Sequence, residues 1–193
     1  SLYYVGKDTK ILHLGKGISY SSYGLNSSIK PEKIYVGENA NFQGNDTGTI
    51  LIETSSNVLV FNYGGAAIPD NVTEIQGNAI QGYAENLKIP SSVTYMGRQE
   101  INAGTLTLDC PANAYRDNLI INADNVYLNK GITSNSNYFY LTIQNLYIGK
   151  DAKTLGTYAG NHNYSIQKIA LKNVEIDDGN TSLIKDGGIL AAR

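Results

Sequence analysis

One phrase of the chain occurs twice with an offset of 21 residues, and this repeat constrains the fold more than any other feature. The segment IPDNVTEI (68–75) returns as IPSSVTYM (89–96), with the Ile-Pro pair, the Val-Thr pair and the final apolar residue at matching places. A unit of about twenty residues cannot bury its own apolar face. Consecutive units must therefore stack and share a continuous core, so the repeat predicts a solenoid.

The local pattern along the chain is that of short strands and turns. Brief alternating runs such as ILHL, KIYV and NVYLN are bounded by Gly and Asn, while helical periodicity is poor throughout. Composition agrees, because the chain has 20 Gly, 15 Tyr and only 4 Pro. Gly and Asn tolerate left-handed backbone angles, and Tyr favours pleated surfaces. A mainly β chain is predicted.

Further units follow when each apolar strand pair is aligned with the small or apolar residue four places after it. The starts of these units are spaced 22, 32, 21, 21, 18, 20 and 23 residues apart. The first and third residues of each strand face inward and the middle residue faces outward. We therefore predict one domain over 1–193, a right-handed, leucine-rich-repeat-like solenoid of about eight short coils with one parallel β-sheet. The predicted inward pairs are Leu12/Leu14, Ile34/Val36, Ala66/Ile68, Leu87/Ile89, Leu108/Cys110, Val126/Leu128, Leu146/Ile148 and Ile169/Leu171.

The long interval of 32 residues contains the segment GTILIETSSNVLVFN (48–62). Two apolar runs in this segment flank Ser55, Ser56 and Asn57, which are residues typical of tight turns. The pattern predicts a β-hairpin that is inserted in one turn of the solenoid or enlarges it.

The segment IPDNVTEIQGNAIQGYAENLKI (68–89) contains the full repeat unit, and it resembles a unit of the BspA-like leucine-rich repeat family. The family places Phe where this chain has Ile80, and commonly Cys where it has Tyr83, which leaves open whether the back of each turn is helical or extended. The resemblance covers this unit and half of the next, and it implies an extracellular, surface-anchored or secreted bacterial protein linked to adhesion. The residues that carry it are Ile68, Pro69, Val72, Ile75, Ala79, Ile80, Gly82, Leu87 and Ile89.

The charge and hydropathy of the chain limit the classes of partner that it is expected to bind. The net charge is −2 with no basic stripe, which removes the electrostatic attraction that nucleic acid or anionic lipid would require. No apolar run approaches the roughly 20 residues that span a bilayer, so we expect no membrane insertion. The lone Cys110 cannot form an internal disulfide, which leaves the redox compartment undecided. No cofactor is expected.

Residues suited to catalysis are scattered. His13 and His162 fall in unrelated turns and are predicted to be surface residues, while Cys110 takes an inward place and is predicted to be a small buried hydrophobe. Enzymes that cleave polysaccharides need clustered carboxylates, and Asp109 is the only acid at a predicted outward strand place. We therefore predict no catalytic residue.

Several polar segments of the chain are compatible either with a special site, such as a metal site or an amide ladder, or with an ordinary turn. Asp177 and Asp178 precede Gly179 and Asn180, a pattern that favours a tight turn over a calcium loop, so no metal site is predicted. The Asn residues of NADN, TSNSNY and GNHNY could hydrogen-bond between turns as ladders. Ordinary turns are the favoured interpretation of these segments.

The remaining signal is a column of outward residues. Tyrosines on a rigid surface offer a large contact area with little entropy to lose, although packing between neighbouring turns explains the same residues. We predict Tyr35, Lys88, Tyr127 and Tyr147 as ligand-binding residues. The full predicted column is His13, Tyr35, Ala67, Lys88, Asp109, Tyr127, Tyr147 and Ala170.

The expected function is a non-enzymatic cell-surface or secreted module for recognition and adhesion. It would bind a protein or glycan ligand through the exposed face of its sheet, and the family resemblance implies that this ligand is host-derived. We expect a monomer. Two alternatives stay open: a β-helical polysaccharide lyase or hydrolase, and a structural spacer of a larger surface protein.

Overall fold

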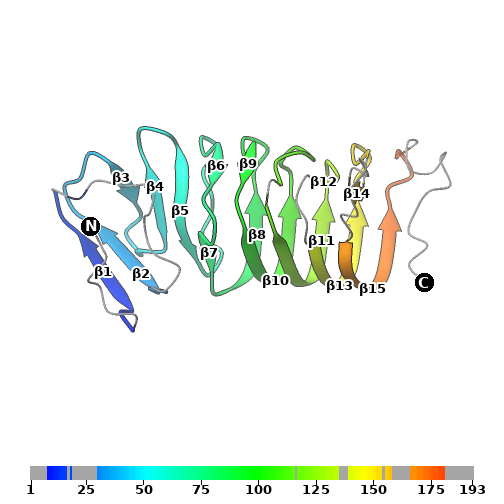
Figure 1. Ribbon diagram of the computed structural model, residues 1–193, viewed down its shortest axis with the longest axis horizontal. Helices are drawn as coiled ribbons and strands as arrows, with labels where there is room; N and C mark the ends of the chain where they lie inside the picture. The colour runs from blue at the N-terminus through cyan, green and yellow to red at the C-terminus, as the bar shows by residue number, and fades with distance from the viewer. Residues whose placement is uncertain are drawn as a thin grey trace.

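The chain is a mainly β solenoid, as predicted, with about six turns rather than eight. In the computed structural model, the turns follow one another along the long axis of the molecule (Figure 1). All regular elements of the described residues are strands, so the backs of the described turns contain no helix. The structure describes residues 8–16, 18, 30–115, 117–134, 139–153, 155–157 and 166–180.

The strands range from two to eleven residues. In chain order they are β1 (Ile11–Leu14), β2 (Lys33–Val36), β3 (Phe42–Gly44), β4 (Ile50–Glu53), β5 (Val58–Tyr63), β6 (Glu74–Ile75), β7 (Ile80–Gln81), β8 (Tyr83–Ile89), β9 (Tyr95–Met96), β10 (Gln99–Leu108), β11 (Leu119–Leu128), β12 (Ile132–Ser134), β13 (Phe139–Ile148), β14 (Leu155–Thr157) and β15 (Ile166–Ile176).

The largest parallel sheet is built from one strand of each of five turns, in the order β15-β13-β11-β10-β8. Parallel pairing in register brings equivalent residues of successive turns side by side. The apolar ones face inward and form one continuous core, because no single turn can bury them alone. One such inward row consists of Leu87, Leu106, Val126 and Leu146, and it ends at Val174 of the edge strand β15, which is 40% exposed.

The long strands of this sheet bend around the core. In β10, buried and less buried residues alternate as far as Ala103, then Gly104 and Thr105 both face outward, and alternation resumes at Leu106. A straight strand alternates without interruption, so two outward residues in succession mark a corner. Each strand thus has a first leg (99–103 in β10) and a second leg (105–108), and the bends are visible along the lower edge of Figure 1.

Asparagines line the corner as a ladder. Asn145 Nδ2 donates to Asn125 Oδ1 at 2.9 Å, and Asn173 Nδ2 donates to Asn145 Oδ1 at 2.8 Å. On the first leg Asn122 Nδ2 donates to Asn102 Oδ1 at 3.0 Å. The predicted turn at NADN is therefore wrong, because strands spaced about 4.8 Å apart bring matching amides within hydrogen-bonding reach. GNHNY and most of TSNSNY lie outside the described residues.

Antiparallel strands interrupt the solenoid near its N-terminal end. Residues 48–62, where a hairpin is predicted, contain β4 and β5, which pair antiparallel, and β3 pairs with the other edge of β4. Both faces of the hairpin are buried: Ile52 and Leu59 belong to the main core, while Leu51 and Phe61 belong to a second core against β1 and β2. A strand that is buried on both faces has a continuous run of apolar residues in its sequence, and TILIE and VLVFN are such runs.

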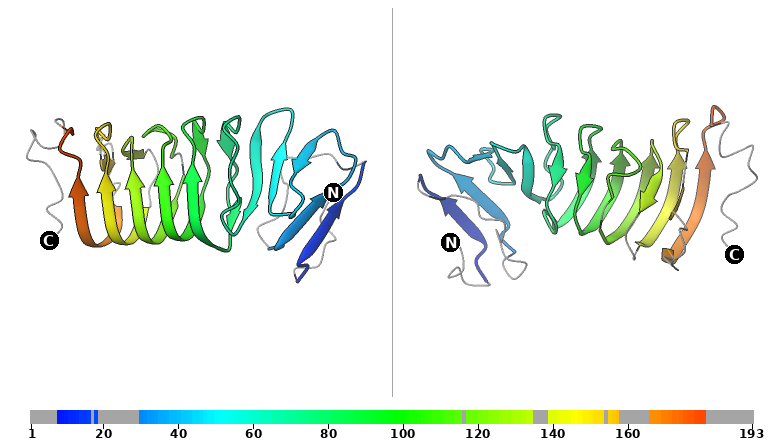
Figure 2. Two further views of the ribbon diagram at one scale, coloured as in Figure 1. Left: turned by 180° about the vertical axis from the view of Figure 1, so that it is seen from behind. Right: turned by 45° about the horizontal axis from the view of Figure 1, so that its top comes forward.

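The described strands form four sheets rather than the single one predicted. The pair β1-β2 is separate from the five-stranded sheet, since β3, β4 and β5 lie between them along the axis (Figure 2). The second large sheet contains β3, β4, β5, β6 and β9 with β7 beside β5, and β12 pairs with β14.

The predicted register is wrong by two residues at β10. Leu106, not Leu108, pairs with Leu87, and Leu108 pairs with Ile89. The Asp109 N–H donates to the Ile89 carbonyl at 3.0 Å. In the predicted register Pro111 would take that place, and Pro has no N–H to donate. Pro90 is tolerated at the end of β8 because β8 is an edge strand of its sheet.

A turn begins at Pro90, directly after the end of β8, and another begins at Pro111, whereas β10 already ends at Leu108. Val93 and Ala114 donate their N–H groups to the carbonyls of Pro90 and Pro111, at 3.2 and 2.9 Å. Two residues, Asp109 and Cys110, therefore lie between the end of β10 and its turn.

The start of the predicted eighth unit is also misplaced. Ile169 and Leu171 pair with Leu141 and Ile143 on the first legs. Val174 and Ile176 take the place of the strand pair on the second leg instead.

We predict that Leu106→Ala lowers the free energy of unfolding by about 2–5 kcal/mol, the usual cost of such a truncation in a packed core. Leu106 is fully buried between Leu87 and Val126. The matched control is Thr107→Ala at the next, outward place, with an expected loss of about 1 kcal/mol or less. Urea unfolding of the 193-residue chain measures both. Equal losses would contradict the assigned faces of β10.

Candidate functional site

The outer side of the second legs carries most of the predicted binding residues. Lys88, Tyr127 and Tyr147 do lie at one register position of the five-stranded sheet. Asp109 and Ala170 were assigned to this row incorrectly, since Asp109 follows the end of β10 and Ala170 pairs with Thr142 on the first leg. The outer column, as we name it, consists of Lys88, Thr107, Tyr127, Tyr147 and Glu175.

Tyr35, the fourth predicted residue, is not part of the outer column. It lies in β2, in the separate sheet with β1, where its ring stacks on His13 with centroids 5.2 Å apart. His13 is exposed, as predicted, and His162 lies outside the described residues. Ala67 is exposed but belongs to no strand. The antiparallel strands break the continuous column that a uniform solenoid would have.

Tyr127 and Tyr147 form an aromatic stack on the outer column. Their centroids are 4.6 Å apart and their planes differ by 11°. This separation is close to the distance between neighbouring strands, so in-register pairing brings the rings face to face. Each ring covers one face of the other, while Tyr127 keeps 40% of its surface exposed. Packing between turns thus uses one face of each ring, and the outer edges stay available for contacts.

A charged cluster lies beside the outer column at the ends of the strands. Lys88 Nζ is 2.9 Å from Asp109 Oδ2, and Asn129 Nδ2 donates to Asp109 Oδ1. Partial burial opposes ionisation of Asp109, but the hydrogen bonds from Asn129 and Lys88 hold its pKa below the ordinary value. The hydrogen bond to Asp109, and its charge, raise the pKa of Lys88. Both groups are therefore charged at neutral pH.

Cys110 is fully buried, which confirms the prediction of a small core residue. Its thiol donates to the Tyr115 hydroxyl at 3.2 Å, and Tyr115 is buried as well. Burial raises the pKa of Cys110 to about 11, so the thiolate required of a nucleophile is not formed near neutral pH.

The aspartates before Gly179 form a turn, as predicted. The N–H of Asn180 donates to the Asp177 carbonyl at 2.8 Å, and the N–H of Gly179 donates to Asp177 Oδ1 at 2.8 Å. The described residues contain no group of three or more His, Cys, Asp or Glu side chains placed to hold a metal ion.

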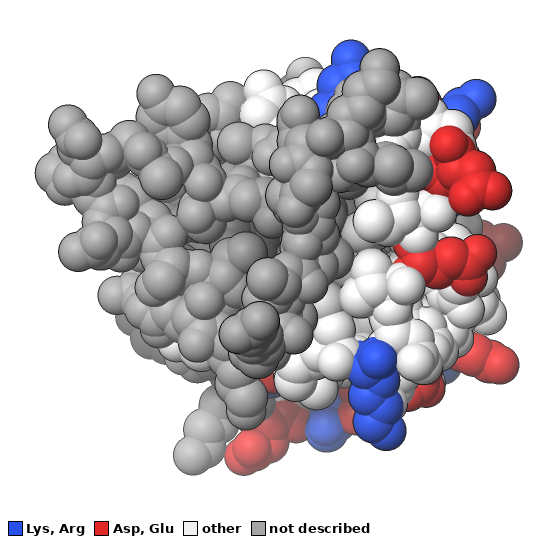
Figure 3. All heavy atoms as spheres, turned by 90° about the vertical axis from the view of Figure 1, so that its right-hand side faces the viewer, with Lys and Arg blue, Asp and Glu red and all other residues white. Residues whose placement is uncertain are grey.

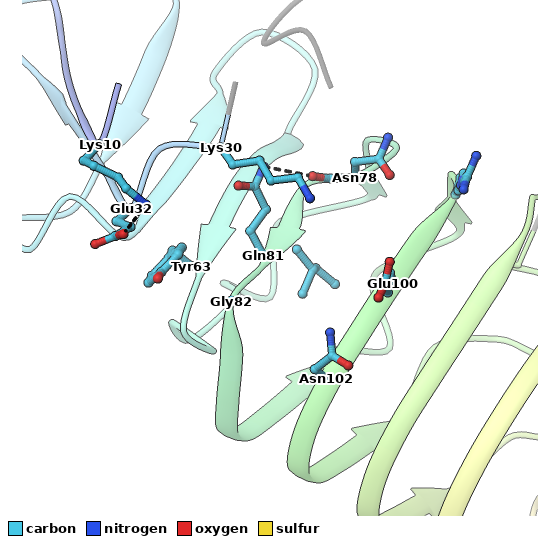
Figure 4. A pocket seen from close by; sticks show the side chains of 11 residues that line it. Lys10, Lys30, Glu32, Tyr63, Asn78, Gln81, Gly82, Glu100 and Asn102 are labelled. Atoms are coloured by element: carbon cyan, nitrogen blue, oxygen red, sulfur yellow. Dashed lines mark hydrogen bonds and ion pairs between the residues drawn. The ribbon is translucent and has the colours of Figure 1, made fainter. Parts of the chain in front are cut away.

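A polar groove of about 570 Å³ opens where the N-terminal strands meet the first legs (Figure 4). Sequence reasoning missed this groove, because its lining comes from segments far apart in the chain. We call it the bend groove. It is lined by Lys10, Lys30, Glu32, Tyr63, Asn78, Ile80, Gln81, Gly82, Arg98, Glu100 and Asn102.

Contacts inside the bend groove fix several of these side chains. Lys10 Nζ and Glu32 Oε1 are 2.7 Å apart, and this hydrogen-bonded ion pair raises the pKa of Lys10. Gln81 Nε2 donates to the Asn78 carbonyl at 3.2 Å (Figure 4). Gly82 has a φ of 73°, and a Cβ on it would lie 3.1 Å from the ring of Tyr63. Gly82 thus adopts the left-handed backbone conformation of the turn, and its lack of a side chain leaves room for the Tyr63 ring.

A second hollow of about 290 Å³ lies on the outer side of the first legs. It shares Asn102 with the bend groove, so the two hollows adjoin. Tyr83 has 63% of its surface exposed, and its hydroxyl lies 2.9 Å from the place of a Cβ on Gly104. The first-leg hollow, as we name it, is lined by Tyr83, Asn102, Ala103, Asn122, Ala123, Asp124, Thr142 and Gln144.

The described surface carries charged side chains of both signs. Seen from the end of the molecule that carries β15, the described atoms in view bear both acidic and basic side chains (Figure 3). The whole chain has a net charge of −2. The described part of the chain holds no apolar helix of membrane-spanning length.

Comparisons of the chain with protein-family models, with curated proteins and with solved structures give no match.

We predict that Asp109→Asn lowers stability at neutral pH by about 0.2–1 kcal/mol, the range of partly exposed ion pairs. Because the pKa of Asp109 is lower in the folded state, its contribution is complete above the unfolded pKa of about 3.9 and is lost as the pH falls through the folded pKa. The difference from the unaltered chain should therefore be constant between about pH 6 and 8 and shrink below about pH 4.

Urea unfolding at several pH values measures this difference, with Lys88→Met as the partner variant. The two substitutions should be non-additive, because they remove the same ion pair. A difference that grows on acidification would contradict the role given to Asp109.

Proposed function

We propose that the chain is a non-enzymatic recognition and adhesion module of a cell-surface or secreted protein, binding a protein or glycan through the exposed face of its five-stranded sheet. The observation that carries this proposal is the in-register display of Tyr127 and Tyr147 on adjacent turns, with Lys88 two turns before Tyr127 in the same column. Hydrogen bonds to neighbouring strands hold each of these positions. A ligand meets a preorganised surface, so binding orders few side chains.

The surface location in this proposal is supported by the resemblance of residues 68–89 to BspA-like repeats. That family is linked to adhesion outside the cell. The structure adds the exposed tyrosine edges of the outer column, and tyrosine is enriched at the centres of binding surfaces.

A glycan-cleaving enzyme is the strongest competing function, because the bend groove gathers three cationic side chains and two carboxylates. Glycoside hydrolysis requires two carboxyl groups, one on each side of the scissile bond. Glu32 of this groove is paired with Lys10, which leaves Glu100 as the carboxylate of the groove without an ion pair among the described residues. Binding of a ligand without catalysis fits this arrangement of charged groups better than glycoside hydrolysis does.

We predict that Tyr127→Ala combined with Tyr147→Ala weakens ligand binding at least about tenfold, the effect of losing a central aromatic contact. The ligand is first sought by screening the chain against immobilised collagen, fibronectin and laminin and against a glycan array. Binding constants of the variants then follow from surface plasmon resonance.

Tyr35→Ala is the matched control, because Tyr35 stacks on His13 in a separate sheet. Unchanged binding by the double variant, at unchanged folding stability, would rule out the outer column. If the chain is instead a structural spacer, neither the matrix proteins nor the glycans of the array should bind the unaltered chain.

A further inference from the structure

The bend groove and the first-leg hollow join at Asn102 into one surface, which we call the polar track. We propose that the polar track binds an uncharged linear glycan that lies along the solenoid axis. This inference rests on the recognition function proposed above. It places the ligand on the first legs, however, and not on the outer column of the second legs.

The first support is the chemistry of the lining. Five side-chain amides line the polar track, and each carries both hydrogen-bond donors and acceptors. Gln81 Nε2 already donates to the Asn78 carbonyl and Asn122 Nδ2 to Asn102 Oδ1, and Gln81 Oε1 is buried. Sugar hydroxyls also donate and accept, so the remaining amide groups match them in either direction. The amides belong to Asn78, Gln81, Asn102, Asn122 and Gln144.

The second support is the balance of charge along the polar track. Its lining holds three cationic groups, Lys10, Lys30 and Arg98, and three carboxylates. Lys10 and Glu32 neutralise each other directly at 2.7 Å. A balanced surface exerts no net Coulomb attraction on a polyanion or a polycation, so an uncharged chain is the ligand that fits.

The third support is the placement of two tyrosines. Tyr63 lies against Gly82 in the bend groove, and Tyr83 lies close to Gly104 where the two hollows adjoin. Tyr83 is the most exposed of the large apolar side chains in the described residues. An aromatic ring held on the surface offers an apolar face and a hydroxyl together, which suits the C–H face and the hydroxyl edge of a sugar ring.

The fourth support is the repeat distance. Successive strands of a sheet lie about 4.8 Å apart, which is close to the length of one sugar residue in a linear chain. A glycan along the axis therefore meets a new turn with each sugar. One row of the track presents a hydroxyl or amide at each of four successive turns: Tyr83, Asn102, Asn122 and Thr142.

Isothermal titration calorimetry of the full chain tests the proposal. The probes are neutral linear hexasaccharides, namely cellohexaose, chitohexaose, mannohexaose, xylohexaose and laminarihexaose. Hexagalacturonate and the hexamer of glucosamine serve as charged comparators. We expect at least one neutral hexasaccharide to bind and to bind more tightly than either charged comparator.

Two track variants and two controls locate the site. Tyr83→Ala and Gln144→Ala should each weaken binding about three- to tenfold. Tyr95→Ala is the matched control, since Tyr95 is 41% exposed and lines neither hollow. The double variant of Tyr127 and Tyr147 should bind the hexasaccharide as the unaltered chain does.

Four results would overturn the proposal. No neutral hexasaccharide binds at millimolar concentration, or a charged comparator binds as tightly as the best neutral one, or Tyr95→Ala weakens binding as much as Tyr83→Ala. Loss of hexasaccharide binding only in the double variant would also overturn the track, while supporting the outer column. Urea unfolding of each variant excludes loss of folding as the cause.

Discussion

Backbone hydrogen bonds between successive turns are the interaction on which the rest of the structure depends. At the ends of the second legs, each turn donates an N–H to the carbonyl of the turn before it: Asp109 to Ile89, Asn129 to Leu108, Gly149 to Leu128 and Asp177 to Ile148. Once this register is set, equivalent residues stand side by side along the axis. Apolar residues then build one core, amides build ladders and tyrosines build a stack.

The same register gives the molecule its two candidate binding surfaces. The corner at Gly104 and Thr105 turns the sheet around the core, so its outer side has two faces. The second legs present Lys88, Tyr127 and Tyr147, and the first legs present the amide-rich polar track. Both faces repeat from turn to turn, which favours an extended ligand over a compact one. The antiparallel strands then end the repeat and close one end of the track as the bend groove.

Alternation of apolar residues was enough to predict the fold class and most inward residues. Leu87, Ile89, Val126 and Leu128 are buried as expected, because a half-buried strand reveals its inner face through its period of two. The register at β10 was not predictable from the 21-residue repeat, because this step relates the turns at Pro90 and Pro111, whereas the paired strand residues Leu87 and Leu106 are only 19 residues apart. The bend groove has no local signature at all: Lys10, Tyr63 and Glu100 meet only after folding.

Through-hydrogen-bond scalar coupling in a deuterated, isotope-labelled sample tests the register most directly. The coupling should be detected between the amide nitrogen of Asp109 and the carbonyl carbon of Ile89, and likewise from Asn129 to Leu108 and from Gly149 to Leu128. These three couplings together would establish the stacked turns that align both binding surfaces. Coupling of Asp109 to Leu87, or of Asn129 to Cys110, would contradict the register and with it the proposed rows.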